Sequence, residues 1–201
     1  SNVLVGTTNG IYHSSEDKQN WQIAQGSRGY EVGALTSMPN GMALAALESG
    51  GLLSSADNGI TWSKLEDVPA DIAGSAFSVT EEGTLLWGTL GNGILRSTDS
   101  GHSWQQVHES TVLSFAASGT TLYAGHSDGL SVSVDDGITW ISLPHPPIHD
   151  LRQIVVVNEQ PLLIGAYAGL QRFYNKKQAW TALPVPGTPL SAIKHVTKDI
   201  L

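Results

Sequence analysis

The sequence predicts an all-β protein, built as a five-bladed β-propeller of four-stranded antiparallel blades. Two observations lead to this prediction: a short turn motif recurs along the 201 residues, and a tryptophan closes each copy. The spacings between successive closing tryptophans are 41, 42, 36 and 40 residues, for Trp21, Trp62, Trp104, Trp140 and Trp180. A repeat of about 40–45 residues with four short strands is typical of propeller blades.

The motif has the pattern Ser-x-Asp-x-Gly-x-(Ser/Thr)-Trp. It is complete at 55–62, 97–104 and 133–140, and degenerate at 14–21 and 172–180. Asp followed two residues later by Gly predicts a turn, because the carboxylate accepts backbone N–H groups and Gly tolerates positive φ. A calcium loop would need further spaced carboxylates. We therefore expect a structural role for Asp57, Gly59, Trp62, Asp99, Gly101, Trp104, Asp135, Gly137 and Trp140.

The motif resembles the Asp-box, or bacterial neuraminidase repeat, of a β-propeller family. That family includes sialidases, sortilin-type receptors, some glycanases and photosystem II assembly factors. The resemblance implies a propeller fold and favours a secreted or periplasmic location. It implies no particular activity, because members of the family do many different things.

Each repeat contains the four strands that a blade needs. In the second repeat they are expected near 32–38, 42–47, 51–55 and 61–65. Three further innermost strands are expected at 74–80, 112–118 and 151–157, and their second strands at 84–89, 121–125 and 161–166.

The two ends of the chain predict how the ring closes. Residues 2–8 resemble second strands, so the first blade begins without its innermost strand, and residues 189–197 resemble innermost strands. Pairing these two segments makes residues 1–201 one closed five-bladed domain and removes exposed sheet edges. The alternative is a segment cut from a propeller of six to eight blades.

Composition excludes several classes of partner. The formal net charge of −8 argues against nucleic acid, which favours a basic surface. No apolar run approaches the ~20 residues of a membrane span. The sequence has no Cys, so it is not a disulfide scaffold. No cofactor is predicted.

Four histidines are expected in loops of one face, namely His108, His126, His145 and His149. The segment from His145 to His149 holds two imidazoles beside Asp150, a combination that can bind zinc. Because the histidines lie on several separate loops, no metal site is predicted.

No catalytic residue is assigned. Sialidases hold the carboxylate of their substrate with three arginines. Of the four arginines here, Arg96 and Arg172 belong to the motif neighbourhoods, which leaves only Arg28 and Arg152. Acidic loop residues could supply a glycosidase pair, but none stands out.

The most informative candidate site lies on the aligned innermost strands. Four of them place small residues near the axis, whereas the fourth blade places Arg152 and Gln153 there. A guanidinium in that position requires an acid, an anion or sugar hydroxyls as its partner. We expect an axial ligand to contact Arg152 and Gln153, with His149, Asp150 and Tyr30 at the rim.

The favoured function is a non-catalytic binding or scaffold propeller with a protein or glycan partner. The alternative is a carbohydrate-directed propeller, either a glycoside hydrolase-like enzyme or a lectin, in which aromatic side chains stack on sugars. Its candidate aromatics are Tyr30, Trp87, Tyr123 and Tyr167. A third interpretation is a trimmed or engineered repeat scaffold, because the chain opens with Ser1-Asn2 instead of Met.

Overall fold

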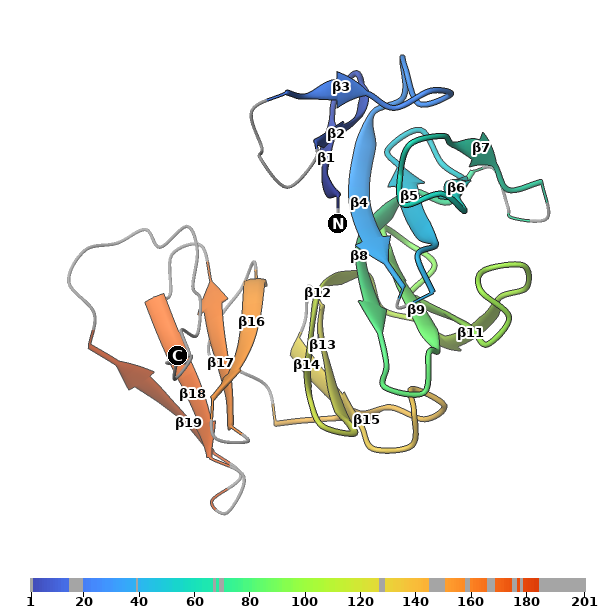
Figure 1. The fold of residues 1–201 in the computed structure, drawn as a ribbon. Coiled ribbons are helices and arrows are strands. Elements are labelled where there is room, and N and C mark those ends of the chain that lie inside the picture. Colours follow the sequence, from blue (N-terminus) through green and yellow to red (C-terminus); the bar gives the residue numbers. More distant parts are fainter. Residues whose placement is uncertain are drawn as a thin grey trace, which may run out of the picture.

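A computed structural model describes residues 2–14, 20–38, 40–66, 68, 71–126, 129–144, 151–157, 160–165, 169–174, 177 and 179–184. Its strands form five antiparallel sheets, one of three strands and four of four strands (Figure 1). The predicted all-β fold with four-stranded antiparallel blades is confirmed. In this described part of the chain, no helix has the length and hydropathy to cross a membrane.

The strands follow the chain blade by blade. The first two sheets contain β1 (Val3–Thr7), β2 (Gly10–Ser14) and β3 (Gln22–Ile23), then β4 (Val32–Ser37), β5 (Ala43–Leu47), β6 (Leu52–Ser55) and β7 (Ser63–Lys64). The third contains β8 (Gly74–Val79), β9 (Leu85–Thr89), β10 (Ile94–Ser97) and β11 (Gln105–His108). The last two contain β12 (Val112–Ser118), β13 (Thr121–His126), β14 (Gly129–Ser133) and β15 (Ile141–Ser142), then β16 (Leu151–Val157), β17 (Gln160–Gly165), β18 (Gly169–Tyr174) and β19 (Ala179–Leu183).

The innermost strands lie side by side around the centre of the molecule. In chain order β4 contacts β8, β8 contacts β12, and β12 contacts β16 (Figure 1). The described strands whose bounds were predicted lie within two residues of the predicted positions, because turn residues mark the same boundaries in every repeat.

The hydrophobic core lies between the sheets. Leu53 and Trp62 of the second sheet pack against Ile11 of the first in one buried cluster. Equivalent clusters fill the next three boundaries, with Trp104, Trp140 and Trp180 at their margins. Four of the five motif tryptophans, Trp62, Trp104, Trp140 and Trp180, therefore pack against the preceding blade, whereas Trp21 is exposed.

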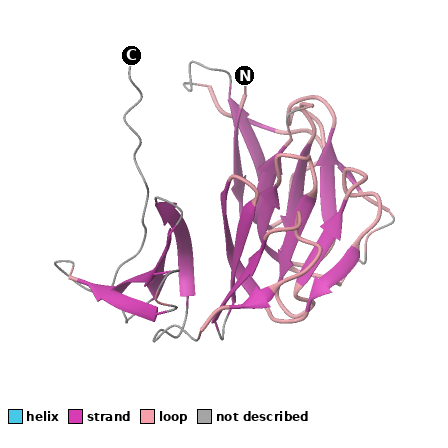
Figure 2. Ribbon diagram, turned by 90° about the horizontal axis from the view of Figure 1, so that it is seen from below, coloured by secondary structure: helices cyan, strands magenta, loops and turns pink. Residues whose placement is uncertain are grey.

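The described strands do not close into a ring. The first sheet has the order β1-β2-β3, so one edge of β1 has no partner among the described strands. One face of this sheet carries Val5, Tyr12 and Ile23 in register, and Val5 is 42% exposed. The first sheet and the last sheet share no described strand pairing, and Figures 1 and 2 show the last sheet set apart from the other strands. Residues 189–197, which were expected to complete β1, lie outside the described residues.

Candidate functional site

The three complete motifs fold into one kind of hydrogen-bonded turn, which we call the box turn (55–62, 97–104 and 133–140). In the first, Asp57 accepts the backbone N–H of Thr61 at 2.9 Å and its hydroxyl at 2.7 Å. The Ser55 hydroxyl donates to Asp57 at 2.8 Å and accepts the N–H of Gly59 at 2.9 Å. Trp62 Nε1 donates to the Gly59 carbonyl at 3.0 Å. The hydrogen bonds that the Asp57 carboxylate accepts, led by that from the Thr61 N–H, lower its pKa to about 2.

The other two box turns repeat this network. Asp99 accepts the N–H of Ser103, and Asp135 accepts that of Thr139, each at 2.9 Å. The pKa of each carboxyl is lowered to about 2, first by the hydroxyl and then by the N–H of the same neighbour. The predicted acceptance of backbone hydrogen bonds within each turn is confirmed. The carboxylate oxygens are occupied by their own turn.

Each box turn also rests on the preceding blade through its glycine. The contacts pair Gly59 with Leu4, Gly101 with Leu44, and Gly137 with Leu86. A Cβ at Gly137 would lie 2.8 Å from Leu86 Cδ2, and the φ of +77° is itself unfavourable for other residues. Glycine is therefore needed for two reasons here, the positive φ of the backbone and the close approach of the preceding blade.

An ion pair reinforces the boundary between the third and fourth blades. Arg96 Nη2 lies 2.7 Å from Asp136 Oδ2, and Arg96 Nε donates to the Asp136 carbonyl at 2.9 Å. The Thr84 hydroxyl donates to the same carboxylate at 2.5 Å. Sequence analysis placed Arg96 beside a motif but did not find its partner. The sequence did contain a signal for this ion pair. The residue before the box glycine is Asn58 and Ser100 in the other two copies, whereas it is the acid Asp136 here.

The innermost strands share a β-bulge at one level. Their pairing with the second strands shifts register at the second residue of β4, β8, β12 and β16, namely Gly33, Ser75, Leu113 and Arg152. The Ser75 hydroxyl donates to Gly88 O at 3.1 Å and also contacts the Val112 carbonyl of the next blade. The bulged residue is therefore the point where neighbouring innermost strands meet.

The predicted axial residues are only partly described. Arg152 occupies the bulge of β16, and Gln153 follows it, half-buried. Tyr30 packs at the boundary of the first two blades, where Lys64 Nζ lies 5.3 Å from its ring centroid. His149 and Asp150 lie outside the described residues. No described contact joins Tyr30 to Gln153.

Two of the aromatic side chains proposed for sugar stacking are core residues. Trp87 is fully buried and Tyr123 is 4% exposed. Trp87 packs between Phe77 and Trp104, with ring centroids 6.2 and 5.5 Å away. These two rings cannot form a sugar platform on the surface.

The expectation of loop positions is wrong for His108 and His126, because they end β11 and β13. Their ring centroids are 5.2 Å apart, and the Ser131 hydroxyl lies 3.2 and 3.0 Å from their Nε2 atoms. The pair thus belongs to packing between blades. Over the described ranges, no group of three or more metal-ligating side chains is present. His145 and His149 lie outside those ranges.

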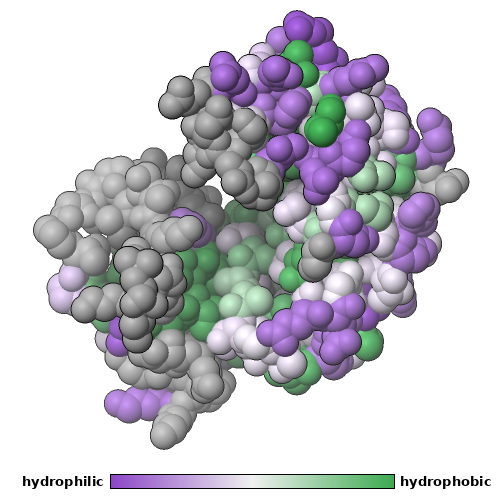
Figure 3. Space-filling model, viewed as in Figure 1, coloured by the Kyte–Doolittle hydropathy of each residue, from purple (hydrophilic) through white to green (hydrophobic). Residues whose placement is uncertain are grey.

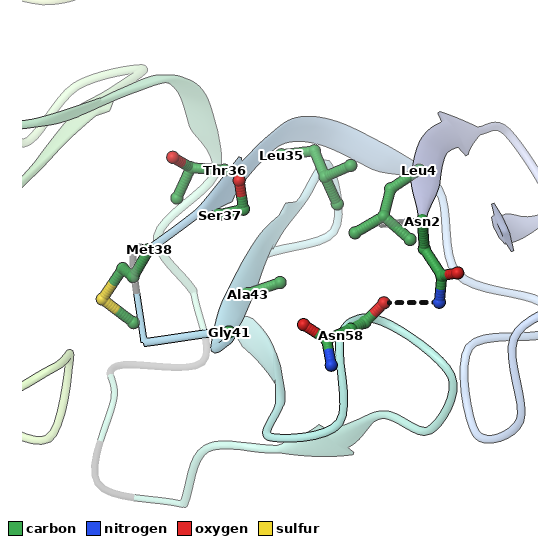
Figure 4. Close-up of a pocket in the computed structure, with 9 residues that line it drawn as sticks. All are labelled: Asn2, Leu4, Leu35, Thr36, Ser37, Met38, Gly41, Ala43 and Asn58. Atoms are coloured by element: carbon green, nitrogen blue, oxygen red, sulfur yellow. Dashed lines mark hydrogen bonds between the residues drawn. The ribbon is translucent and has the colours of Figure 1, made fainter. Parts of the chain in front are cut away.

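A pocket of about 390 Å³ lies between the first two sheets, beside β1 and β4 (Figure 4). Leu4 and Leu35 project into it from β1 and β4. At its margin, Asn2 Nδ2 donates to the Asn58 carbonyl at 3.2 Å. The pocket lies beside the box-turn side of the blades, whereas the ligand was expected on the axial face.

The fold is that of known β-propellers. YCF48 bound to a D1 peptide superimposes with a TM-score of 0.66 at 17% identity, over 90% of this chain and 62% of that one. The GH74 xyloglucanase from Xanthomonas campestris superimposes with a TM-score of 0.69 at 18% identity, over 94% of this chain and 37% of that one. The computationally designed Ika8 protein superimposes with a TM-score of 0.64 at 13% identity, over 89% of this chain and 57% of that one.

At these identities the likeness establishes the β-propeller fold and nothing finer. The chain spans 62%, 37% and 57% of the lengths of these three structures, which is less than two thirds of each. No family model matches the sequence, and no curated protein is significantly similar to it.

Proposed function

We propose that this protein is a non-catalytic binding or scaffold β-propeller whose partner docks on the axial face beside β16. The observation that carries the proposal is the bulge repeated in the four innermost strands, with Arg152 at the last. Bulges turn a residue out of the ladder and are common next to binding sites. At the same level Gly33 and Ser75 fit closely against the next blade, so a guanidinium needs a polar partner there.

A protein segment is the partner class we favour, with a glycan as the second. Arg152 offers a planar fork for a carboxylate or for carbonyl and hydroxyl oxygens, and Gln153 offers an amide. His149, Asp150 and Tyr30 form the proposed rim. The fold similarity to YCF48, which was solved with a bound peptide, supports a peptide partner. Figure 3 shows apolar surface in a hollow near the centre of the molecule, beside the last sheet, which suits a peptide better than a sugar.

The carbohydrate-directed alternative is supported by the fold similarity to the GH74 xyloglucanase. The burial of Trp87 and Tyr123 weakens it, because aromatic stacking would have to come from Tyr30 or Tyr167.

Peptide and glycan arrays, followed by calorimetry on the ligands that bind, test the proposal. Arg152→Ala should abolish binding, and Arg152→Lys should weaken it because the planar fork is lost. Arg28→Ala, an exposed arginine with the same charge change, is the matched control. Equal affinity of wild type and Arg152→Ala would exclude the axial site, and turnover of a glycoside substrate panel would exclude the non-catalytic assignment.

We further propose that the propeller has five blades and that residues 189–197 complete the first blade on β1. The unpaired edge of β1 and its uncovered apolar face, with Val5 42% exposed, support this closure. Alignment with β8 places Ser191 at the bulge, where its hydroxyl should meet the Val32 carbonyl as Ser75 meets that of Val112. The rival is a larger ring that needs further blades.

Cross-linking tests the closure cleanly, because the chain contains no cysteine. In the proposed register, which follows the pairing of Leu35 with Ala45, Ile193 lies opposite Val5. Val5→Cys with Ile193→Cys should form an intramolecular disulfide. Val5→Cys with Lys194→Cys should not, since a shift of one residue turns the side chain to the other face. Cross-linking in neither pair, or equally in both, would contradict the closure.

A further inference from the structure

A second groove lies between the third and fourth blades, on the box-turn side. It has a volume of about 260 Å³. Its walls are the turn after β8, with Thr80, Glu81 and Glu82, and the fourth-blade box turn, with Val134. Leu122, which is 2% exposed, lies among its lining residues. The space suits one or two side chains of a bound segment better than a whole small ligand.

The walls of this groove are held in place before anything binds. The carboxylate of Asp136 is fixed by Arg96 and Thr84, as described above. Asp135 is fixed within its own turn by Thr139. Thr80 Oγ1 accepts the N–H of Thr84 at 3.1 Å, which ties the opposite wall to the same network. A preformed groove loses little entropy when a partner is ordered against it.

The free charge on the groove is negative. Asp135 and Asp136 are occupied by the contacts above, whereas neither Glu81 nor Glu82 has a described hydrogen bond or ion pair. Both glutamates are exposed. Their carboxylates are therefore available to a cationic group of a partner.

An unusual apolar side chain lies beside these carboxylates. Val134 is 69% exposed, and at its motif position the other two box turns carry Ala56 and Thr98. In the same turn Ile138 is 55% exposed. Between the second and third blades, by contrast, Met38 and Met42 pack into a core cluster at the corresponding turn. Exposed apolar surface rimmed by polar groups is typical of interaction sites.

We propose that this groove binds a basic, apolar peptide segment of a protein partner. An apolar side chain of the segment covers Val134 above Leu122, and a lysine or arginine next to it faces Glu81 and Glu82. The site is separate from the proposed axial site and does not depend on it. A contact this small is typical of weak, transient recognition.

The test uses a fluorescein-labelled peptide, Gly-Leu-Lys-Leu-Lys-Gly, and fluorescence anisotropy with the full chain. Glu81→Lys/Glu82→Lys should weaken its binding by about tenfold or more. The matched control is Glu66→Lys/Glu109→Lys, two exposed loop residues of the opposite face. Each Glu→Lys change adds +2, so both double variants raise the net charge by 4, from −8 to −4. The control should change affinity less than about twofold, since exposed charges more than about 10 Å away are screened.

Val134→Ser tests the apolar half of the site. It should weaken binding by about fivefold, which corresponds to burial of a small apolar side chain. Arg152→Ala should leave the affinity unchanged. Equal loss in both charge-reversal variants would mean attraction to net charge alone and would overturn the proposal. So would binding that depends on Arg152, equal binding of a peptide with Glu in place of Lys, or no binding.

Discussion

The first and second blades both carry a motif tryptophan, but the side chain is buried only in the second blade. Trp62 closes a complete box turn and is 5% exposed, whereas Trp21 closes a degenerate copy and is 43% exposed. The complete copies have Gly where the degenerate copy has Lys18. Trp62 packs against Ile11 of the first blade, whereas no described blade precedes the first, so the comparison shows that a motif tryptophan is buried only where the preceding blade covers it.

The fifth blade shows the same contrast. Trp180 Nε1 donates to the Pro144 carbonyl at 2.6 Å, outside its own motif copy. In the complete copies, the tryptophan instead bonds to the carbonyl of the box glycine. The two blades that flank the open seam are thus the two without a complete motif. The closure proposed above would therefore depend at this seam on the pairing of residues 189–197 with β1.

The largest effect that separates these regions is expected from tryptophan truncation. Trp62→Ala should lower the free energy of unfolding by about 3–5 kcal/mol, because it opens a large cavity between two blades. Trp21 is 43% exposed in the described strands, so Trp21→Ala should cost less than about 1 kcal/mol unless the proposed closure places the fifth blade over it. Urea denaturation followed by circular dichroism measures both. A cost for Trp21 close to that for Trp62 would mean that another blade covers Trp21 in solution.

Substitution of a box glycine should cause the next largest loss in the free energy of unfolding. Gly137→Ala combines a positive φ with a clash against Leu86, and we expect a loss of about 2–4 kcal/mol. Gly29→Ala is the matched control, because its φ is +86° and nothing lies within 4 Å of the added Cβ. It should cost about 1 kcal/mol, the conformational part alone. Equal losses in thermal unfolding would contradict the role of the glycine at the blade boundary.

Much of this fold could be predicted from sequence, because propeller blades repeat their pattern locally. The turn residues of 55–62 and the apolar run of 42–47 mark strand positions without knowledge of any neighbour. The contact of Gly59 with Leu4 could not be found in this way. It joins two blades, and its glycine is already explained by the turn.

The same limit applies to the candidate sites. The bulge at Arg152 is a feature of register, and register depends on the partner strand. His108 and His126 were assigned to loops, yet strand pairing extends β11 and β13 to include them. Trp87 and Tyr123 looked equally suited to a surface or a core, and only the packing of adjacent blades decides between these.

A smaller effect is expected at the ion pair between the third and fourth blades. Arg96→Ala leaves the Asp136 carboxylate without its cation at a site where it is 25% exposed. We expect a loss of about 1–2 kcal/mol in urea denaturation. Adding Asp136→Asn to this variant should recover part of the loss, because the unpaired charge is removed. Additive losses in the double variant would mean that the two side chains are not coupled.

The smallest effect concerns acid stability, which depends on the box carboxylates. The pKa of Asp99 is about 2 in the folded chain against an ordinary 3.8, because Ser103 and Ser97 donate hydrogen bonds to the carboxylate. A folded pKa below the unfolded value adds stability above about pH 4, and this contribution is lost as the pH falls towards 2. Asp99→Asn should therefore destabilise the protein at pH 6 and reduce the dependence of the urea midpoint on pH between 4 and 2. Thr98→Ala, a neighbour that makes no described bond to the carboxylate, should keep the wild-type slope. An unchanged slope in Asp99→Asn would mean that the carboxylate contributes nothing through its turn, and that the box stabilises the blade only through its glycine and tryptophan.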